Sequence, residues 1–251
     1  MTWLALLAAG AGAGVLAGLL GIGGGFVFVP VLLLLYREAG VAPDAAMPLA
    51  VGTSLAAIVP TSLSSVYAHA RKHNVDWSAF ARLAPGLVLG ALAGAALAAS
   101  VDGRLLERVF GAFLVAVAVQ LVLELRPAAH RDLPGRFATG AAGGVIGAFS
   151  ALIGIGGGTL TAPYLVWCNR PMLLAVGTAA AAGLPIAVTA ALGFTAAGLV
   201  EWPAALALGG AAMLAAPLGA RLAHAAPARV LRRAFAGLLI LVAAGLLLGA
   251  A

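Results

Sequence analysis

Long uncharged stretches are the feature that most restricts the fold of this chain. Residues 1–36 contain no charged side chain, and further uncharged stretches follow at 45–68, 83–101, 109–123, 137–169, 171–200, 202–220 and 234–251. A helix needs about 20 apolar residues to cross a bilayer. Backbone polar groups inside lipid must be satisfied within the protein, so only helices or closed barrels span it. Because these stretches are continuous rather than alternating, the sequence predicts an all-α integral membrane protein with about eight hydrophobic segments.

The composition agrees with a membrane environment. Hydrophobic residues make up 63% of the 251 residues and charged residues only 9%, whereas a soluble domain carries about 25% charged residues. The 14 Lys and Arg residues lie mostly in short loops between apolar segments, which favours membrane anchoring over nucleic-acid binding. The first segment lacks a basic start, so we expect it to belong to the mature protein. Cys168 is the single cysteine, and the sequence indicates no metal and no cofactor.

The chain contains an internal repeat. Gly-Ile-Gly-Gly-Gly occurs at 21–25 and again at 154–158, an offset of 133 positions. After one loop that is eight residues shorter in the second copy the offset becomes 125, and Ala-Val-Gly-Thr occurs at 50–53 and 175–178. Duplicated halves are a common plan of secondary transporters. We therefore expect two repeats of four segments, with the first segment of each repeat broken at its glycines. The expected units are 1–125, an inter-repeat loop at 126–136, and 137–251.

Loop charges favour halves of inverted topology. If all eight segments cross once, the two sides of the membrane carry 8 and 6 basic residues. If each glycine-containing segment instead enters and returns as a hairpin, the sides carry 11 and 3. The positive-inside rule expects the second distribution in a bacterial inner membrane, with both termini periplasmic. Parallel halves remain the alternative. The residues that this arrangement places in the cytoplasm include Arg71, Lys72, Arg131 and Arg232.

The repeated glycine motif predicts an anion site. Four glycines in five residues break a helix, and the half-helix that follows begins with amide N–H groups without partners at the positive end of its dipole. Such an end binds an anion without a charged side chain. The alternative is that the glycines only permit a tight turn. The predicted binding residues at the two motifs are Gly21, Gly23, Gly24, Gly25, Gly154, Gly156, Gly157, Gly158 and Thr159.

Hydroxyls and prolines recur after each motif. Thr53, Ser54 and Thr178 are further candidates for substrate contact, although hydroxyls in membrane helices often bond to their own helix. Prolines inside helices free a carbonyl and kink the helix, which makes them candidate hinges. Ionisable residues are nearly absent from the apolar segments, which argues against a cation pump. The candidate hinge prolines are Pro30, Pro60, Pro163 and Pro185.

The sequence resembles the sulfite exporter TauE/SafE family, also called the toluene sulfonate uptake permeases. The resemblance rests on Gly-Leu-Leu-Gly-Ile-Gly-Gly-Gly at 18–25 with Pro30, on Ala-Val-Gly-Thr-Ser at 50–54, and on Ile-Gly-Ile-Gly-Gly-Gly at 153–158 with Pro163. It covers essentially the whole chain. It implies a permease for small sulfur-containing anions such as sulfite, sulfoacetate or other organosulfonates.

Three classes of function compete. The first is a secondary transporter of small anions that works by alternating access, with the coupling ion, proton or sodium, and a homo-oligomeric state left open. The second is a passive anion channel, which can use the same broken helices. The third, a membrane-embedded enzyme, is disfavoured because the apolar segments hold no constellation of His, Cys or carboxylate residues. The sequence therefore predicts a transporter and no enzymatic activity.

Overall fold

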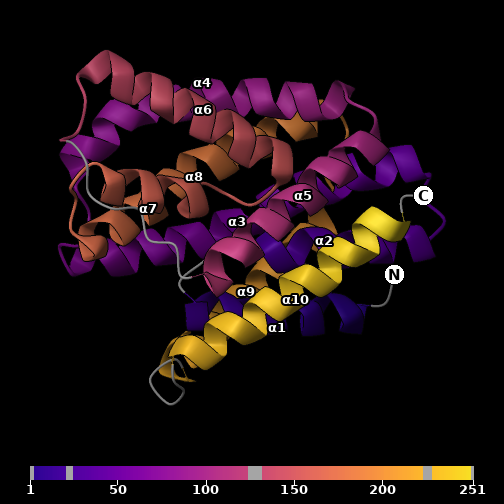
Figure 1. Ribbon diagram of the computed structural model, residues 1–251. Coiled ribbons are helices and arrows are strands. Elements are labelled where there is room, and N and C mark those ends of the chain that lie inside the picture. The colour runs from indigo at the N-terminus through magenta and orange to yellow at the C-terminus, as the bar shows by residue number, and fades with distance from the viewer. Residues whose placement is uncertain (1–2, 21–24, 124–131, 223–227, 250–251) are drawn as a thin grey trace.

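The computed structural model describes residues 3–20, 25–123, 132–222 and 228–249, and every regular element in these residues is a helix (Figure 1). The ten helices of this part of the chain are α1 (Trp3–Leu20), α2 (Gly25–Glu38), α3 (Pro43–Arg71), α4 (Trp77–Ser100), α5 (Gly103–Val122), α6 (Arg136–Ile153), α7 (Gly158–Trp167), α8 (Met172–Ala196), α9 (Trp202–Leu222) and α10 (Ala228–Gly249). Each predicted glycine-containing segment corresponds to a pair of helices, α1 with α2 and α6 with α7.

Short polar signals set the helix boundaries. The Asp76 carboxylate accepts a hydrogen bond of 2.9 Å from the Ala79 amide and caps α4. Asp102 caps α5 in the same way, through the amides of Arg104 and Leu105. An N-cap carboxylate satisfies amides that have no partner within the helix, and its charge complements the helix dipole. These two caps fix where the chain re-enters the apolar layer.

Helices α4 and α6 pack along their length and run parallel (Figure 1). A Cβ on Gly86 would overlap the Gly140 carbonyl oxygen, and a Cβ on Gly94 would overlap that of Ala148. The contact therefore advances in the same direction along both helices. Small residues permit this close backbone approach, which is how helices associate in a membrane where apolar burial alone gives little driving force.

Helices α1 and α9 form the matching pair. A Cβ on Gly14 would overlap the Ala212 carbonyl oxygen, and a Cβ on Gly219 would overlap that of Val15. Position 219 corresponds to position 94 by the offset of 125, and position 15 corresponds to position 148 by the offset of 133. The same kind of glycine contact is thus made in both halves of the chain, each time between a helix of one half and a helix of the other.

Between these pairs, α3 and α8 run antiparallel to each other. A Cβ on Gly52, early in α3, would overlap the carbonyl oxygen of Leu199, just after α8. A Cβ on Gly177, early in α8, would overlap that of Asn74, just after α3. Each helix also packs against the opposite half, α3 on α9 and α8 on α4. The core of the protein lies along this central pair.

Helix α7 returns toward the level at which α6 begins. Arg170 follows α7 and forms an ion pair of 3.3 Å with Asp76, which directly precedes α4. Because α4 and α6 run parallel, the end of α7 lies at the same level as the start of α6. Helix α7 has ten residues and is too short to cross a bilayer. The predicted break in the second half is confirmed, and α6 with α7 forms a helical hairpin.

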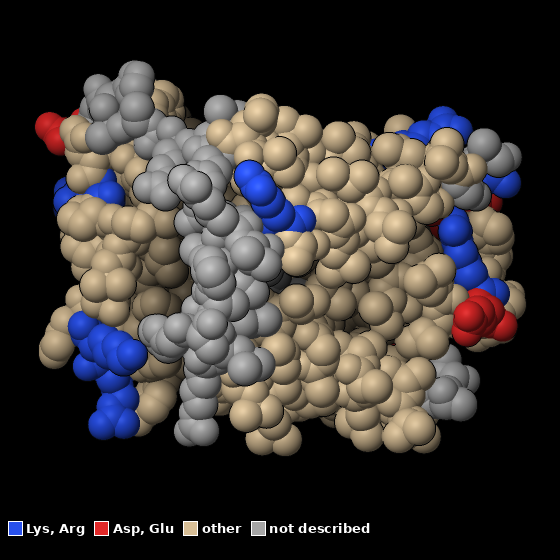
Figure 2. Space-filling model, turned by 60° about the horizontal axis from the view of Figure 1, so that its bottom comes forward, with Lys and Arg blue, Asp and Glu red and all other residues tan. Residues whose placement is uncertain are grey.

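Six helices in the described residues, α3, α4, α5, α6, α8 and α9, are long and apolar enough to span a membrane, and α1 and α10 carry shorter apolar stretches. Eight spanning segments therefore stay a prediction. Large apolar side chains such as Phe137 and Leu89 are exposed at 92% and 68%, as expected of a lipid-facing surface. In Figure 2 the visible charged side chains gather mainly toward the left and right ends, and the surface between them is largely uncharged.

Candidate functional site

Two glycines turn the chain between α6 and α7. Gly154 has a φ of 74° and ends α6 in the left-handed conformation, and Gly156 has the same φ of 74°. Side chains with a Cβ rarely adopt this conformation, so the turn requires glycine at both positions. The second copy of the motif therefore forms a sharp, fixed turn inside the helical core.

The two glycine-containing segments meet in space. A Cβ on Gly25, the first residue of α2, would lie 2.6 Å from the Gly154 carbonyl oxygen and 2.6 Å from the Ile155 Cα. The Ser54 hydroxyl, from α3, donates a hydrogen bond of 2.9 Å to the same carbonyl oxygen and is fully buried. The start of α2 is thus held directly against the turn that precedes α7.

The turn is enclosed by the central helices. Gly156 faces Ile58 of α3, and Gly157 faces Ile186 of α8. A Cβ on Gly183 would lie 3.7 Å from the Ser62 hydroxyl oxygen and 3.8 Å from the Gly157 nitrogen. The start of α7 therefore lies between α3 and α8, where a hydroxyl and a backbone amide face the same small residue.

Polar groups without partners surround this turn. Gly157, at the N-cap of α7, makes no side-chain capping hydrogen bond, and the first amides of a helix have no acceptor within it. The hydroxyl oxygens of Ser150, Thr159 and Thr161 are buried and have no hydrogen-bond partner within the described residues. Ser150 and Thr161 are 1% and 0% exposed. Buried polar groups are normally satisfied, so these mark a place for a ligand or water.

The equivalent positions of the first half are apolar. Offset by 133 residues, Thr159 corresponds to Phe26 and Thr161 to Phe28. Both phenylalanines are buried, and Phe26 packs against other aromatic rings. Ser150 corresponds to Ala17. In the described residues the hydroxyls at the breaks therefore come from α6 and α7, and the hydroxyls of Ser54 and Ser62 reach the second break from α3.

Thr53 and Thr178 connect the two halves of the chain. The Thr53 Oγ1 accepts a hydrogen bond of 3.0 Å from the Glu201 amide, and the Thr178 Oγ1 accepts one of 2.8 Å from the Asp76 amide. The Tyr36 hydroxyl also donates to Thr53. Both threonines are fully buried. Each Ala-Val-Gly-Thr motif thus holds the loop that precedes α9 or α4 in the opposite half, a structural contact that the sequence does not reveal.

The other predicted residues are located as follows. Gly158 is the first residue of α7 and faces open space. Gly21, Gly23 and Gly24 lie outside the described residues. Substrate contact by the predicted residues stays a prediction. The four prolines lie inside helices, Pro30 in α2, Pro60 in α3, Pro163 in α7 and Pro185 in α8.

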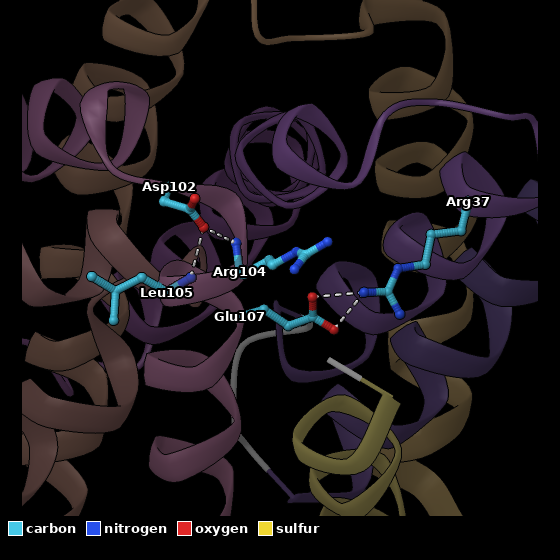
Figure 3. Close-up of polar contacts among 5 residues, drawn as sticks. All are labelled: Arg37, Asp102, Arg104, Leu105 and Glu107. Atoms are coloured by element: carbon cyan, nitrogen blue, oxygen red, sulfur yellow. Dashed lines mark hydrogen bonds and ion pairs between the residues drawn. The ribbon is translucent and has the colours of Figure 1, made fainter. Parts of the chain in front are cut away.

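A buried ion pair is the main feature that the sequence did not indicate. One terminal nitrogen of Arg37, after the apolar stretch of α2, contacts both carboxylate oxygens of Glu107 at 2.8 and 2.6 Å (Figure 3). The Glu107 side chain is 1% exposed. The sequence assigned this part of α5 to a loop because Arg104 and Arg108 flank it. A single acidic residue one turn after the start of an apolar helix, as Glu107 is in α5, is the sequence signal that predicts such a pair.

Comparison with known proteins adds the family. Residues 6–246 match the family described as Sulfite exporter TauE/SafE. The chain belongs to this family. Among relatives of this TauE/SafE protein, a probable membrane transporter protein of Haemophilus influenzae is 32% identical over 196 residues, which cover 78% of this chain and 74% of the relative. The probable membrane transporter protein YunE of Bacillus subtilis is 29% identical over 239 residues, which cover 87% and 88%.

A further relative of this TauE/SafE protein comes from Xylella fastidiosa. This probable membrane transporter protein is 31% identical over 195 residues, which cover 75% of this chain and 72% of the relative. No solved structure matches the chain significantly. The TauE/SafE family is a family of membrane transporters, and the six apolar helices of spanning length agree with that assignment.

Proposed function

We propose that this TauE/SafE protein is a secondary transporter of small anions, with sulfur oxyanions or organosulfonates such as sulfite and sulfoacetate as its substrates. The observation that carries the proposal is the second glycine turn. There the first amides of α7, which have no acceptor within the helix, follow directly on a turn flanked by the hydroxyls of Ser150, Thr159 and Thr161, which are buried and have no partner among the described residues. Amides and hydroxyls together bind an oxyanion without a compensating cation. The family description supports sulfite as the first substrate to test.

Alternating access of two inverted halves is the mechanism that we infer. Three relationships support it: α3 and α8 run antiparallel, α4 with α6 and α1 with α9 pair parallel, and the glycine contacts recur at equivalent positions. In such carriers the substrate binds between the halves while one half rocks against the other. The turn before α7 lies between α3 of the first half and α8 of the second, which is the position that this mechanism requires.

The proposed location is the bacterial inner membrane with both termini periplasmic. The residues 71–76, the loop after α7 and the start of α6 lie at one end of the parallel pair α4 and α6. This end carries Arg71, Lys72, Arg136 and Arg170, so the positive-inside rule assigns it to the cytoplasm.

Anion binding by purified variants tests the site. Thr161→Val replaces a buried hydroxyl, which has no partner in the described part of the chain, by a methyl group of similar size, so the fold should be kept. We expect its affinity for sulfite to fall by about tenfold, because a hydrogen bond to an anion contributes about 1.5–3 kcal/mol. Gly157→Val should lower affinity further, because its side chain would collide with Ile186 and move the amides.

Gly210→Val is the matched control, since no atom lies within 4 Å of a Cβ at this position of α9. It should bind sulfite as the parent does. Parental affinity in both Thr161→Val and Gly157→Val would place the anion site elsewhere. Reconstituted vesicles then separate the two transport classes. Saturable uptake with counterflow indicates a carrier, whereas non-saturating flux would replace the carrier by a passive anion channel.

A further inference from the structure

One ion pair breaks the equivalence of the two halves. Arg170 follows α7 and pairs with Asp76, which precedes α4 of the other half. Arg37 is the residue equivalent to Arg170, and Glu201 is equivalent to Asp76. By analogy Arg37 would pair with Glu201, yet in this structure it pairs with Glu107 of its own half.

The sequence gives Arg37 an acid at a position where the second half has none. The residue of the second half at the position equivalent to Glu107 is Arg232. Arg37 has Glu107 at 2.6 Å, and the Arg37 side chain is 31% exposed. The two acids available to Arg37 belong to opposite halves of the chain.

Glu201 lies close to the turn of chain that carries Arg37. The Glu201 amide and the Tyr36 hydroxyl both donate hydrogen bonds to the Thr53 Oγ1. Tyr36 directly precedes Arg37, so the end of α2 that carries Arg37 is already linked through Thr53 to the chain at Glu201.

We propose that Arg37 exchanges Glu107 for Glu201 when the transporter changes the side to which it opens. The proposal rests on the proposed alternating access of inverted halves. In such carriers the second state follows when each half adopts the arrangement of the other. The counterpart of the pair Arg170–Asp76 in that state is Arg37–Glu201. The exchange keeps the guanidinium paired at both ends of the movement, since an unpaired charge at low dielectric is costly.

The charges around Glu107 are consistent with its release. Arg104 extends from the same side of α5 as Glu107 (Figure 3), and residues three positions apart are neighbours on a helix. Arg104 therefore places a second positive charge on the face of α5 that carries Glu107.

Cysteine accessibility tests the exchange without relying on transport. In a Cys168→Ala background, Ser62→Cys reports access to the central turn, and a membrane-impermeant maleimide is applied to intact spheroplasts and to inverted vesicles. Glu107→Gln removes the partner of the present state, and Glu201→Gln removes the partner of the other state. We expect the ratio of labelling from the two sides to change about tenfold in opposite directions.

Glu38→Gln is the matched control, because it neutralises an exposed acid next to Arg37 and should leave the ratio unchanged. Labelling ratios that shift in the same direction in both variants would overturn the exchange. If Glu107→Gln fails to fold, an unchanged labelling ratio in the half-exposed Glu201→Gln variant would overturn it alone. Sulfite uptake by the parent is measured in parallel. If the labelling ratios shift in opposite directions but the parent takes up no sulfite, the exchange of partners by Arg37 stands and sulfite is rejected as the substrate. The two proposals therefore fail separately.

Discussion

The side-chain oxygen of Thr53 accepts a hydrogen bond from the backbone amide of Glu201, which lies 148 positions further along the chain. Thr178 does the same for Asp76 at the equivalent place. Thr53→Val and Thr178→Val leave these partly buried amides without an acceptor, and we expect each to lower stability by about 1–3 kcal/mol. Thermal unfolding of the purified protein measures the loss. Thr53→Ser and Thr178→Ser retain the hydroxyl and serve as controls; valine variants as stable as the serine variants would contradict the contact.

The two described ion pairs should differ in their contribution to stability. Arg37→Met leaves Glu107 buried without its partner, which costs about 3–5 kcal/mol for a buried pair. Arg170→Met leaves Asp76, whose side chain is 15% exposed, and should cost no more than about 1 kcal/mol. The difference in unfolding midpoint between the two variants is the measurement. Equal losses would mean that solvent reaches Glu107 in the membrane.

The prolines of the central helices are predicted hinges. Pro60→Ala and Pro185→Ala should leave the protein folded in the membrane and slow its transport, because each proline frees a backbone carbonyl where α3 or α8 can bend. Initial rates of sulfite uptake in vesicles, normalised to the amount of inserted protein, test this expectation. Pro85→Ala in α4, on the exposed face of that helix, is the control. Parental rates in both central variants would reduce these prolines to packing residues.

The inverted topology predicts which loops face the cytoplasm. Single cysteines at positions 71, 72, 131 and 232 in a Cys168-free background should react with an impermeant maleimide only from the cytoplasmic side. A cysteine at position 104, and tags at both termini, should be accessible only from the periplasm. Labelling of positions 71 and 104 from the same side would contradict the loop assignment, and termini on opposite sides would contradict inversion.

The sequence predicted the helical membrane fold and the break between α6 and α7 for simple physical reasons. Uncharged length identifies spans, and Gly154 and Gly156 are required at positive φ whatever surrounds them. The Arg37–Glu107 pair was missed because it depends on side-chain contacts between α2 and α5, which no local pattern encodes. The partners of Thr53 and Thr178 were missed for the same reason. The recurring motif was visible in the sequence, but its docking site in the opposite half was not.

The candidate site was predicted in part. The glycines of the second motif were identified because they cannot continue a helix. Ser150 and Thr161 were overlooked because a lone hydroxyl in an apolar helix normally bonds to its own backbone. Only the folded structure places their oxygens in the interior, where they have no partner among the residues that the structure describes.

The pairing of α1 with α9 has a consequence for biosynthesis. Helix α1 is made first, and the carbonyl groups that its glycines approach belong to residues synthesised nearly two hundred positions later. Until α9 enters the membrane, the glycine face of α1 must be accommodated by lipid or by the insertion machinery. Helix α4 meets α6 much sooner after its synthesis. The second hairpin should therefore dock during translation, whereas the first half reaches its final arrangement only after the ninth helix has been inserted.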